Sequence, residues 1–182
     1  MGEPLWSTEK WLWRKSIGSC SAFIRRQDVT KCWRKEDGDW VIRDIAFIDD
    51  WSEADYAYLV TCLRGTLEGG GTLFGAFEDG VLKGFASVEG RPLGSRADML
   101  DLSSLHVSRD RRGQGAGRRL FTLAAGWARD HGASKLYISA HSAVETQAFY
   151  RAMGCVEAAE YDPHHTAKEP CDCQLEYRLT AI

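Results

Sequence analysis

The sequence predicts one α/β (α+β) domain with a mixed sheet, because strand-type and helix-type hydrophobic patterns alternate along the chain. No proline- or glycine-rich linker interrupts this alternation, and no internal repeat occurs. The length of 182 residues suits one sizeable core better than two. We therefore expect a single domain over residues 36–182, preceded by an irregular extension, residues 1–35, that packs against it.

The composition is that of a soluble globular protein, with 44% hydrophobic and 27% charged residues. No apolar stretch approaches the ~20 residues of a membrane span. The amino-terminal "MGEPLWSTEKWLWRK" lacks the basic start and apolar stretch of a secretory signal. Six cysteines are scattered without a disulfide framework, which favours reduced thiols in a cytoplasmic protein.

Charge is distributed unevenly around the net value of −3. Residues 1–35 hold eight basic and three acidic side chains, whereas residues 36–182 hold fifteen basic and twenty-three acidic ones. A basic arm can indicate a nucleic-acid contact. This arm has no run of like charges and carries four tryptophans, so we expect it to pack against the domain.

The first half of the chain predicts, in this order, a short helix within residues 9–15, a strand, a helix and a hairpin. "WVIRDIAFI", Trp40–Ile48, has the pattern of a strand. A helix is expected over Trp51–Gly65, with Ser52 as its amino-terminal cap and the final glycine as its stop. Two strands joined across Asp79-Gly80 form the strongest hairpin signal in the sequence.

The second half predicts two helices around a short strand. The first helix ends at Gly132, which suits a left-handed cap, and "KLYISA", Lys135–Ala140, is the strand. Ser142, with Glu145 three residues later, predicts a capping box that opens a helix over Ala143–Met153. Two last strands are expected over residues 155–161 and 173–179, with an irregular loop, residues 162–171, between them.

The stretch "MLDLSSLHV", Met99–Val107, reads as a strand with a shift in its pattern. Leu100 and Leu102 alternate in one parity, and Leu105 and Val107 alternate in the other. Because strand side chains have a period of two, a β-bulge at the intervening serines would restore burial on one face. The alternative is a strand buried on both faces. The pattern alone does not choose between them.

The segment "VSRDRRGQGAGRRLF", Val107–Phe121, places five arginines and three glycines just before a helix. Free N–H groups at a helix start bind anions, and glycines let a phosphate approach the backbone. The alternative is a turn with a solvated basic face. Arg118 breaks the spacing of both the P-loop and the dinucleotide fingerprint. What remains is R-x-x-G-x-G, formed by Arg112, Gly115 and Gly117.

A strand ending in L-x-V, followed by R-G-Q-G-x-G and a helix, resembles the acetyl-CoA signature of the GNAT superfamily of N-acetyltransferases. "TQAFYRAMGC", Thr146–Cys155, is similar to the family's later A-x-x-F-Y-x-x-x-G-F motif, and the resemblance covers about Trp40–Leu179. It implies a mixed, mostly antiparallel sheet of six to seven strands, with helices on both faces. It also implies that this sheet is splayed beside the strand that binds the cofactor.

The resemblance implies acetyl-CoA as cofactor, with its pyrophosphate on main-chain amides of the glycine turn and its pantetheine arm along the L-x-V strand. The residues expected to bind it are Leu105, His106, Val107, Arg112, Gly113, Gln114, Gly115, Ala116, Gly117 and Arg118. Arg109, Arg111 and Arg119 are candidates for the 3′-phosphate, and the sequence does not choose among them.

The implied chemistry is attack of a neutral amine on a thioester, which needs a proton acceptor and a proton donor. Asp101 occupies the family's frequent base position, with an exposed strand acid as the alternative; a water chain or His106 could share the task. Tyr150 occupies the usual acid position and is expected to face the cleft, with simple packing as the alternative. Ala143 stands where the family often has asparagine, and Cys155 where an aromatic is common.

The resulting expectation is an acetyltransferase that acts on a primary amine of a small molecule, without nucleic-acid or membrane partners. A homodimer is left open, and a non-catalytic acyl-CoA-binding or regulatory module is the alternative function. The loop 162–171 and the helix from Ser52 correspond to the family's acceptor side. Cys171-Asp172-Cys173 lacks the spacing of a structural zinc site, so no metal is expected.

Overall fold

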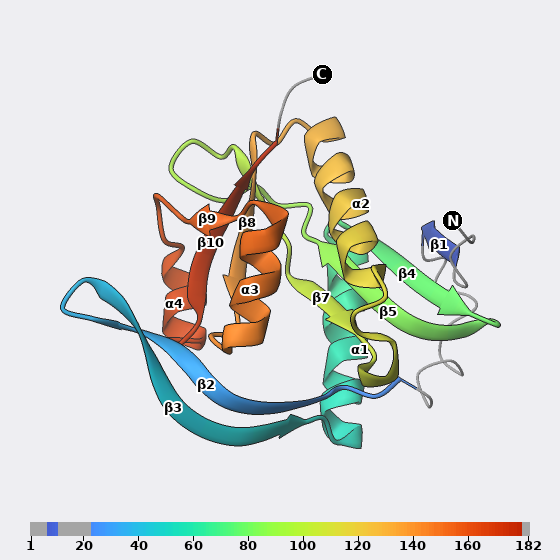
Figure 1. Ribbon diagram of the computed structural model, residues 1–182. Helices are drawn as coiled ribbons and strands as arrows, with labels where there is room; N and C mark the ends of the chain where they lie inside the picture. The colour runs from blue at the N-terminus through green and yellow to red at the C-terminus, as the bar shows by residue number, and fades with distance from the viewer. Residues whose placement is uncertain (1–6, 11–22, 180–182) are drawn as a thin grey trace.

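The computed structural model describes residues 7–10 and 23–179 (Figure 1). The strands are β1 (Ser7–Lys10), β2 (Arg26–Glu36), β3 (Asp39–Asp50), β4 (Thr72–Glu78), β5 (Val81–Val88), β6 (Met99–Asp101), β7 (Ser104–Val107), β8 (Lys135–Ala140), β9 (Val156–Glu157) and β10 (Cys173–Arg178). The helices are α1 (Glu53–Glu68), α2 (Ala116–Asp130), α3 (Val144–Met153) and α4 (Pro163–Lys168), with a 3₁₀ turn at Arg109–Arg111.

The sheet consists of two four-stranded halves. One half has the order β1-β4-β5-β7 and the other the order β6-β8-β10-β9, while β2 and β3 form a separate ribbon. The pairing is antiparallel throughout except between β6 and β8. Helices cover both faces, as Figure 1 shows. The α/β fold class, the mixed and mostly antiparallel sheet and its splay are therefore confirmed.

The chain passes from one half to the other at Leu102 and Ser103, where the pattern shift was found. The Leu102 N–H still donates to Tyr137 O of β8 at 2.9 Å, whereas Ser104 already pairs with Ser87 of β5. Between them, the Ser103 hydroxyl donates to the Glu89 carboxylate at 2.6 Å. The shift in the pattern, for which a bulge and a strand buried on both faces were the two readings, is thus a change of sheet, and no ladder joins β7 to β8 in the described chain.

The largest core lies between the two half-sheets and helices α2 and α3. From α2 it takes the buried face Leu120, Phe121, Ala124 and Ala128, which the helical spacing predicts. A smaller core lies under α1 on the opposite face of the first half, around Leu63 and Phe85. Within the described residues, no helix combines the length and the apolar character needed to cross a membrane.

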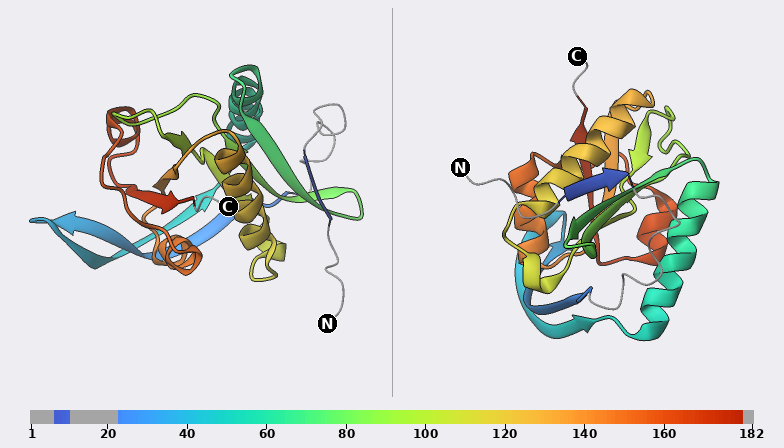
Figure 2. Two further views of the ribbon diagram at one scale, coloured as in Figure 1. Left: turned by 90° about the horizontal axis from the view of Figure 1, so that it is seen from above. Right: turned by 90° about the vertical axis from the view of Figure 1, so that its right-hand side faces the viewer.

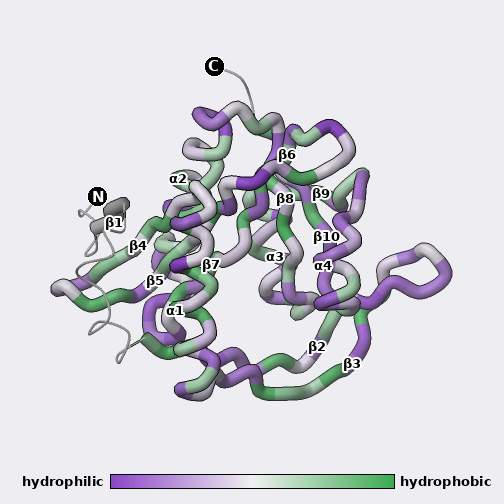
Figure 3. Tube along the Cα trace, turned by 180° about the vertical axis from the view of Figure 1, so that it is seen from behind, coloured by the Kyte–Doolittle hydropathy of each residue, from purple (hydrophilic) through white to green (hydrophobic). Residues whose placement is uncertain are grey.

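The β2–β3 ribbon crosses the open side of the split sheet and contacts both halves. Just before β2, the Ile24 N–H donates to the Ser108 hydroxyl at 3.0 Å, next to β7. Farther along β2, the Trp33 N–H donates to Ser142 O at 2.8 Å, just before α3. The ribbon then projects from the body, as the view from above shows (Figure 2), and its tip is hydrophilic (Figure 3).

This ribbon corrects the expectation of an irregular extension, because residues 26–35 lie in β2. The short helix expected within residues 9–15 is also wrong at its start, since Glu9 and Lys10 lie in β1; the rest falls outside the described residues. The buried residues of β2 do not alternate with a period of two, because the register of the strand shifts between Val29 and Lys31. As a result, Val29 and Cys32 are its buried residues.

Three further expectations about helices are wrong. Helix α1 passes through Gly65 and continues to Glu68. No capping box opens α3, because the Ser142 hydroxyl accepts a hydrogen bond from Arg34 Nη1 at 2.7 Å instead. The loop expected over residues 162–171 contains α4, which begins after Asp162; the carboxylate of that residue accepts hydrogen bonds from two N–H groups of the helix.

Other local signals are confirmed. Asp79 and Gly80 have φ angles of 49° and 77°, which a tight hairpin requires. The Ser52 capping box is present at α1, with Asp55 as its partner. Gly132 has the left-handed φ angle of 84° just after α2, and β8 has the expected bounds.

Candidate active site

A cavity of about 570 Å³ opens at the gap between β7 and β8. Its walls come from both half-sheets, from the amino-terminal end of α2, from α3 and from β2. The lining residues are Arg25, Gln27, Leu102, Ser103, Ser104, Leu105, His106, Val107, Arg111, Arg112, Gly113, Gly115, Ala116, Gly117, Arg118, Ser139, Ala140, His141, Glu145, Thr146, Phe149 and Tyr150. Every residue expected to bind the cofactor lines it except Gln114.

The amino-terminal end of α2 presents main-chain N–H groups to this cavity. Gly115 caps the helix with a φ angle of 86°, and no side chain caps the first turn. The first intrahelical bond is donated by the Arg119 N–H to Gly115 O, so the earlier amides of the helix have no acceptor within it. A Cβ atom on Gly117 would lie 3.3 Å from the Phe149 ring, so a side chain there would crowd α3. These features suit a diphosphate.

The edge of β7 that faces the gap has main-chain groups with which no strand of the described chain pairs. Because the Ser108 N–H donates to Lys83 O and β7 pairs antiparallel with β5, the alternate residues Leu105 and Val107 direct their main-chain groups to the open edge. The Arg112 side chain confirms this direction, since its Nε donates to Val107 O at 3.2 Å. An extended chain with amide groups could therefore pair with β7 as an additional strand. Acetyl-CoA carries both a diphosphate and such a chain, so the residues present fit it.

The arginines of the turn differ in their partners. Arg109 forms an ion pair with Asp28 of β2 at 2.7 Å and does not line the cavity. Arg111 lines the cavity and pairs with Glu78 at 2.6 Å. Burial, together with the nearby charges of Arg25 and other cations, lowers the pKa of Arg112. The cationic character of this end of the cavity favours an anionic ligand.

His106 is held as a neutral hydrogen-bond acceptor. Its Nδ1 accepts a hydrogen bond from Arg25 Nε at 3.2 Å, and its ring packs edge-on against Trp51. Burial first, and then the charges of Arg25 and Arg112, lowers the pKa of His106 to about 3. The imidazole therefore stays uncharged at neutral pH with its Nδ1 lone pair occupied, which removes it as a proton acceptor there.

Tyr150 belongs to both the core and the cavity. Its side chain is buried, with 6% of the residue exposed, and its ring packs against Phe121 and Phe149. Burial raises the pKa of Tyr150, so its hydroxyl keeps the proton at neutral pH. No described residue forms a hydrogen bond with this hydroxyl. The sequence expected a tyrosine turned from the core, and the structure instead buries its ring while leaving it on the cavity wall.

Asp101 does not line the cavity. Asp101 is only 5% exposed, and its Oδ2 lies 3.1 Å from His165 Nε2 of α4. The alternative interpretation of Asp101 as an exposed strand acid is therefore wrong. Burial raises the pKa of Asp101, and the bond to His165 opposes this shift. The same bond raises the pKa of His165. The structure thus brings Tyr150 and the glycine turn together but leaves Asp101 behind the cavity wall.

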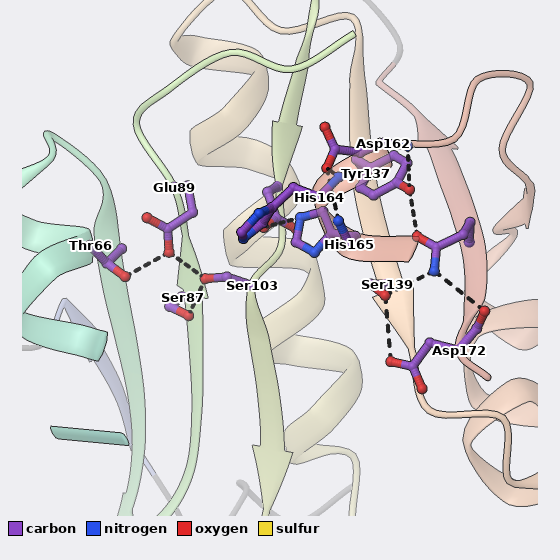
Figure 4. A network of polar contacts seen from close by, with 12 residues as sticks. Thr66, Ser87, Glu89, Ser103, Tyr137, Ser139, Asp162, His164, His165 and Asp172 are labelled. Atoms are coloured by element: carbon purple, nitrogen blue, oxygen red, sulfur yellow. Dashed lines mark hydrogen bonds and ion pairs between the residues drawn. The ribbon is translucent and has the colours of Figure 1, made fainter. Parts of the chain in front are cut away.

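Sequence reasoning missed a polar group on β8 and β10 (Figure 4). Ser139 lines the cavity, and its hydroxyl accepts a hydrogen bond from Gln174 Nε2 at 3.0 Å. The same hydroxyl lies 3.4 Å from Asp172 Oδ2. From the sequence, Asp172 was named only as the residue between Cys171 and Cys173, whose spacing does not suit structural zinc. A period-two pattern in "DCQLE", with polar residues at alternate positions, was the signal available.

A second polar group faces it from the other half-sheet. The Glu89 carboxylate accepts hydrogen bonds from the hydroxyls of Thr66 and Ser103, both at 2.6 Å, as Figure 4 also shows. Ser103 lines the cavity, so both groups reach its wall. Among the described residues, no three His, Cys, Asp or Glu side chains lie close enough together to hold a metal ion.

Comparison with known proteins identifies the family of the chain. The sequence profile of the acetyltransferase (GNAT) family matches residues 15–155, which is most of the chain. A search of curated proteins found no match.

Solved structures share the fold over nearly the whole chain. Nourseothricin acetyltransferase superposes with a TM-score of 0.69 at 18% identity, covering 97% of this chain and 99% of that one. A protein from Bacillus anthracis, provisionally named a streptothricin acetyltransferase and solved with acetyl coenzyme A, gives 0.71 at 11% identity with the same coverage. A GNAT acetyltransferase from Elizabethkingia anophelis with acetyl-CoA bound gives 0.51 at 16%, covering 67% of this chain and 82% of that one.

At these identities the superpositions establish the shared fold, and the profile match establishes the family. The chain belongs to the GNAT family of acetyltransferases, whose acetyl donor is acetyl-CoA.

Proposed function

We propose that the protein transfers an acetyl group from acetyl-CoA to a primary amine of a small molecule by direct attack of the amine nitrogen. The observation that carries this proposal is a single cavity that contains the uncapped end of α2, the open edge of β7 and the Tyr150 side chain. One cavity therefore has a place for a diphosphate, a place for an extended amide chain and a protonated hydroxyl group of the protein.

The cavity residues divide by task. The amides at the start of α2, around Gly115 and Gly117, hold the diphosphate, and the open edge of β7 holds the amide chain. The N–H of Leu105 points to the same edge and can stabilise negative charge on the acetyl oxygen as the bond forms. Tyr150 gives its proton to the departing sulfur, a role that its raised pKa supports because the hydroxyl is protonated at neutral pH.

The acceptor amine approaches from the face between α1 and α4. A carboxylate from each half-sheet, Glu89 behind Ser103 and Asp172 behind Ser139, lies next to the cavity wall and suits a cationic molecule. We do not assign proton acceptance to Asp101, because its carboxylate is buried and paired with His165. That pair instead fixes the position of α4 beside the gap.

Incubation with acetyl-CoA and a panel of amines, followed by measurement of free thiol, tests the proposal. The panel includes polyamines, amino sugars, amino acids and nourseothricin, the compound named in one similar structure. Amine-dependent thiol release, with an acetylated product identified by mass spectrometry, is expected for at least one class. Release that is the same without amine, or acylation of hydroxyl groups alone, would contradict transfer to nitrogen.

A further inference from the structure

The hydrogen-bonded group on β8 and β10 connects the cavity wall to the half-buried carboxylate of Asp172. Gln174 lies directly opposite Ser139 in the antiparallel pairing, so their side chains share a face. Asp172 precedes Gln174 by two residues and lies beside Ser139. The Ser139 hydroxyl is therefore the point at which this group meets the cavity.

The direction of each hydrogen bond is fixed by its neighbours. The Tyr137 hydroxyl accepts from the Asp162 N–H at 2.9 Å and donates to Gln174 Oε1. Gln174 must then turn its NH₂ group toward Ser139, whose oxygen accepts that bond. Since one Ser139 lone pair is occupied, its own proton is directed to Asp172 Oδ2, and the second lone pair remains for a ligand in the cavity.

The environment of Asp172 favours a carboxylate that takes up a proton readily. Burial raises the pKa of Asp172 to about 6, and the nearby charge of Glu169 contributes to the increase. The bond from Ser139 and the charges of His165 and Arg34 act in the opposite direction. Ser139, to which this carboxylate is hydrogen-bonded, and Tyr150 both line the cavity. A carboxylate of this kind is a stronger base than an exposed one and is still ionised at pH 7 to 8.

We propose that Ser139 and Asp172 form a proton relay that accepts the proton of the substrate amine. This inference rests on the proposed function, because it assigns the base of that reaction. Ser139 is the catalytic residue that contacts the amine, and Asp172 is the terminal proton acceptor. Gln174 positions Ser139 through the bond described above. Asp101, the sequence-based candidate, stays behind the wall with His165.

The step balances in atoms and charge. The amine nitrogen bonds to the acetyl carbon, and the bond between that carbon and sulfur breaks. The nitrogen gives one proton to Ser139 Oγ, which passes its own proton to Asp172. The departing sulfur takes one proton from Tyr150. Asp172 then releases its proton and Tyr150 regains one, so a neutral amine and the thioester give an amide and a free thiol.

The pH dependence follows from the groups that face Asp172. These are Ser139 on β8, Arg34 on β2, and His165 and Glu169 on α4 and its end. Asp172 accepts a proton only when it is ionised. The turnover number kcat is therefore expected to fall as pH decreases through about 6.

Kinetics of the Asp172→Asn variant against pH tests the relay with the amine that the wild-type protein acetylates. We expect kcat to fall by about 100-fold or more, because general-base assistance contributes about 10²–10⁴-fold. The fall of kcat below about pH 6, the acidic limb of the pH profile, should disappear while the Kd for acetyl-CoA stays unchanged. Ser139→Ala should lower kcat less, because a water molecule can replace the hydroxyl.

Glu169→Gln is the matched control, because it removes a nearby exposed charge without touching Ser139. It should keep wild-type kcat at pH 8 and move the acidic limb to lower pH, since Glu169 helps to raise the pKa of Asp172. Two results together would overturn the relay in favour of the Asp101–His165 pair. His165→Gln would lose the fall of kcat at acid pH, and Asp172→Asn would keep both this fall and the wild-type kcat.

A measurement without turnover separates this inference from the proposed function. Carbon-13 NMR of the carboxyl groups in the ligand-free protein should show one resonance that titrates near pH 6 and is absent in Asp172→Asn. Ser139→Ala should raise this pKa, because the lost hydrogen bond stabilises the charged form. If no amine is acetylated but this titration is found, the proposed function fails and Asp172 is a structural acid. If acetylation occurs and Asp172 titrates near 4, unaffected by Ser139, the relay fails alone.

Discussion

Tyr150 illustrates how one residue joins packing to chemistry. Its ring lies against Phe121 and Phe149 in the main core, and this burial raises the pKa of the hydroxyl that lines the cavity. A phenol in this setting donates a proton and does not accept one at neutral pH. The packing that fixes its position is therefore also what keeps it protonated.

The Tyr150→Phe variant should lower kcat by about 100-fold, because it removes a positioned acid and leaves the ring. The Kd for acetyl-CoA, measured by calorimetry, should stay within about twofold of the wild-type value. Tyr177→Phe is the control, since Tyr177 packs on the other side of Phe121 and does not line the cavity. Equal losses of turnover and of cofactor affinity in Tyr150→Phe would contradict the acid role.

The position of the glycine turn on the cavity wall was predictable, because its residues follow one another in the chain and form one motif. The proposed relay of Ser139 and Asp172 was not predictable. Ser139 lies in β8 and Asp172 lies just before β10, and the two meet only because these strands pair. The burial of Asp101 by His165 was equally hidden, since those residues are far apart in sequence. Chemistry shared between distant segments needs the register of the sheet before it can be recognised.

At the scale of the element, the start of α2 depends on the left-handed backbone of Gly115. The cap has no side-chain hydrogen bond, which leaves the first amides open to the cavity. A Cβ atom on Gly115 would meet no atom within 4 Å, so substitution there strains only the backbone. The cost of a left-handed alanine is about 1–2 kcal/mol.

Gly115→Ala should therefore lower the free energy of unfolding by about 1 kcal/mol and weaken acetyl-CoA binding severalfold, as the turn shifts to relieve the strain. Gly126→Ala, farther along the same helix, is the matched control. Gly126 has ordinary helical backbone and open space, so alanine there should stabilise by about 0.5–1 kcal/mol and leave binding unchanged. Urea unfolding and calorimetry measure both effects. Unchanged affinity in Gly115→Ala would argue against the turn as the diphosphate site.

Elements with strong local signals were predictable, and those set by tertiary contacts were not. The hairpin at Asp79 and the cap at Ser52 are decided by a few neighbouring residues. The failed capping box at Ser142 shows the opposite case, because Arg34 from β2 takes the hydroxyl. Strand β2 itself was missed because its register shift at Val29 removes the alternation by which strands are recognised.

For the whole molecule, the division of the sheet creates the cavity. Two half-sheets that share a core with α2 and α3 separate at the change of partner between β6 and β7, and the open edge of β7 remains. The sequence indicated this division through one odd step between leucines. The cytoplasmic location and the domain boundary expected from the sequence stay predictions, and a homodimer stays an open possibility.

Acetyl-CoA should protect β7 and the start of α2 from hydrogen exchange, because its amide chain and its diphosphate engage main-chain amides of these two elements. Mass spectrometry should show slower exchange in peptides covering residues 104–118 when acetyl-CoA is added. The ribbon tip, residues 36–39, serves as an internal reference and should not change. Protection confined to segments outside the cavity would contradict binding along β7.

The β2–β3 ribbon has a consequence for how far the protein can open. One continuous strand is anchored beside Ser108 at one end and beside Ser142 at the other. The nine steps from Ile24 to Trp33 reach roughly 30 Å when extended, at about 3.3 Å per residue. Main-chain length between two anchors, and not any single side chain, therefore sets an upper limit on how far the two half-sheets can separate on this side of the gap.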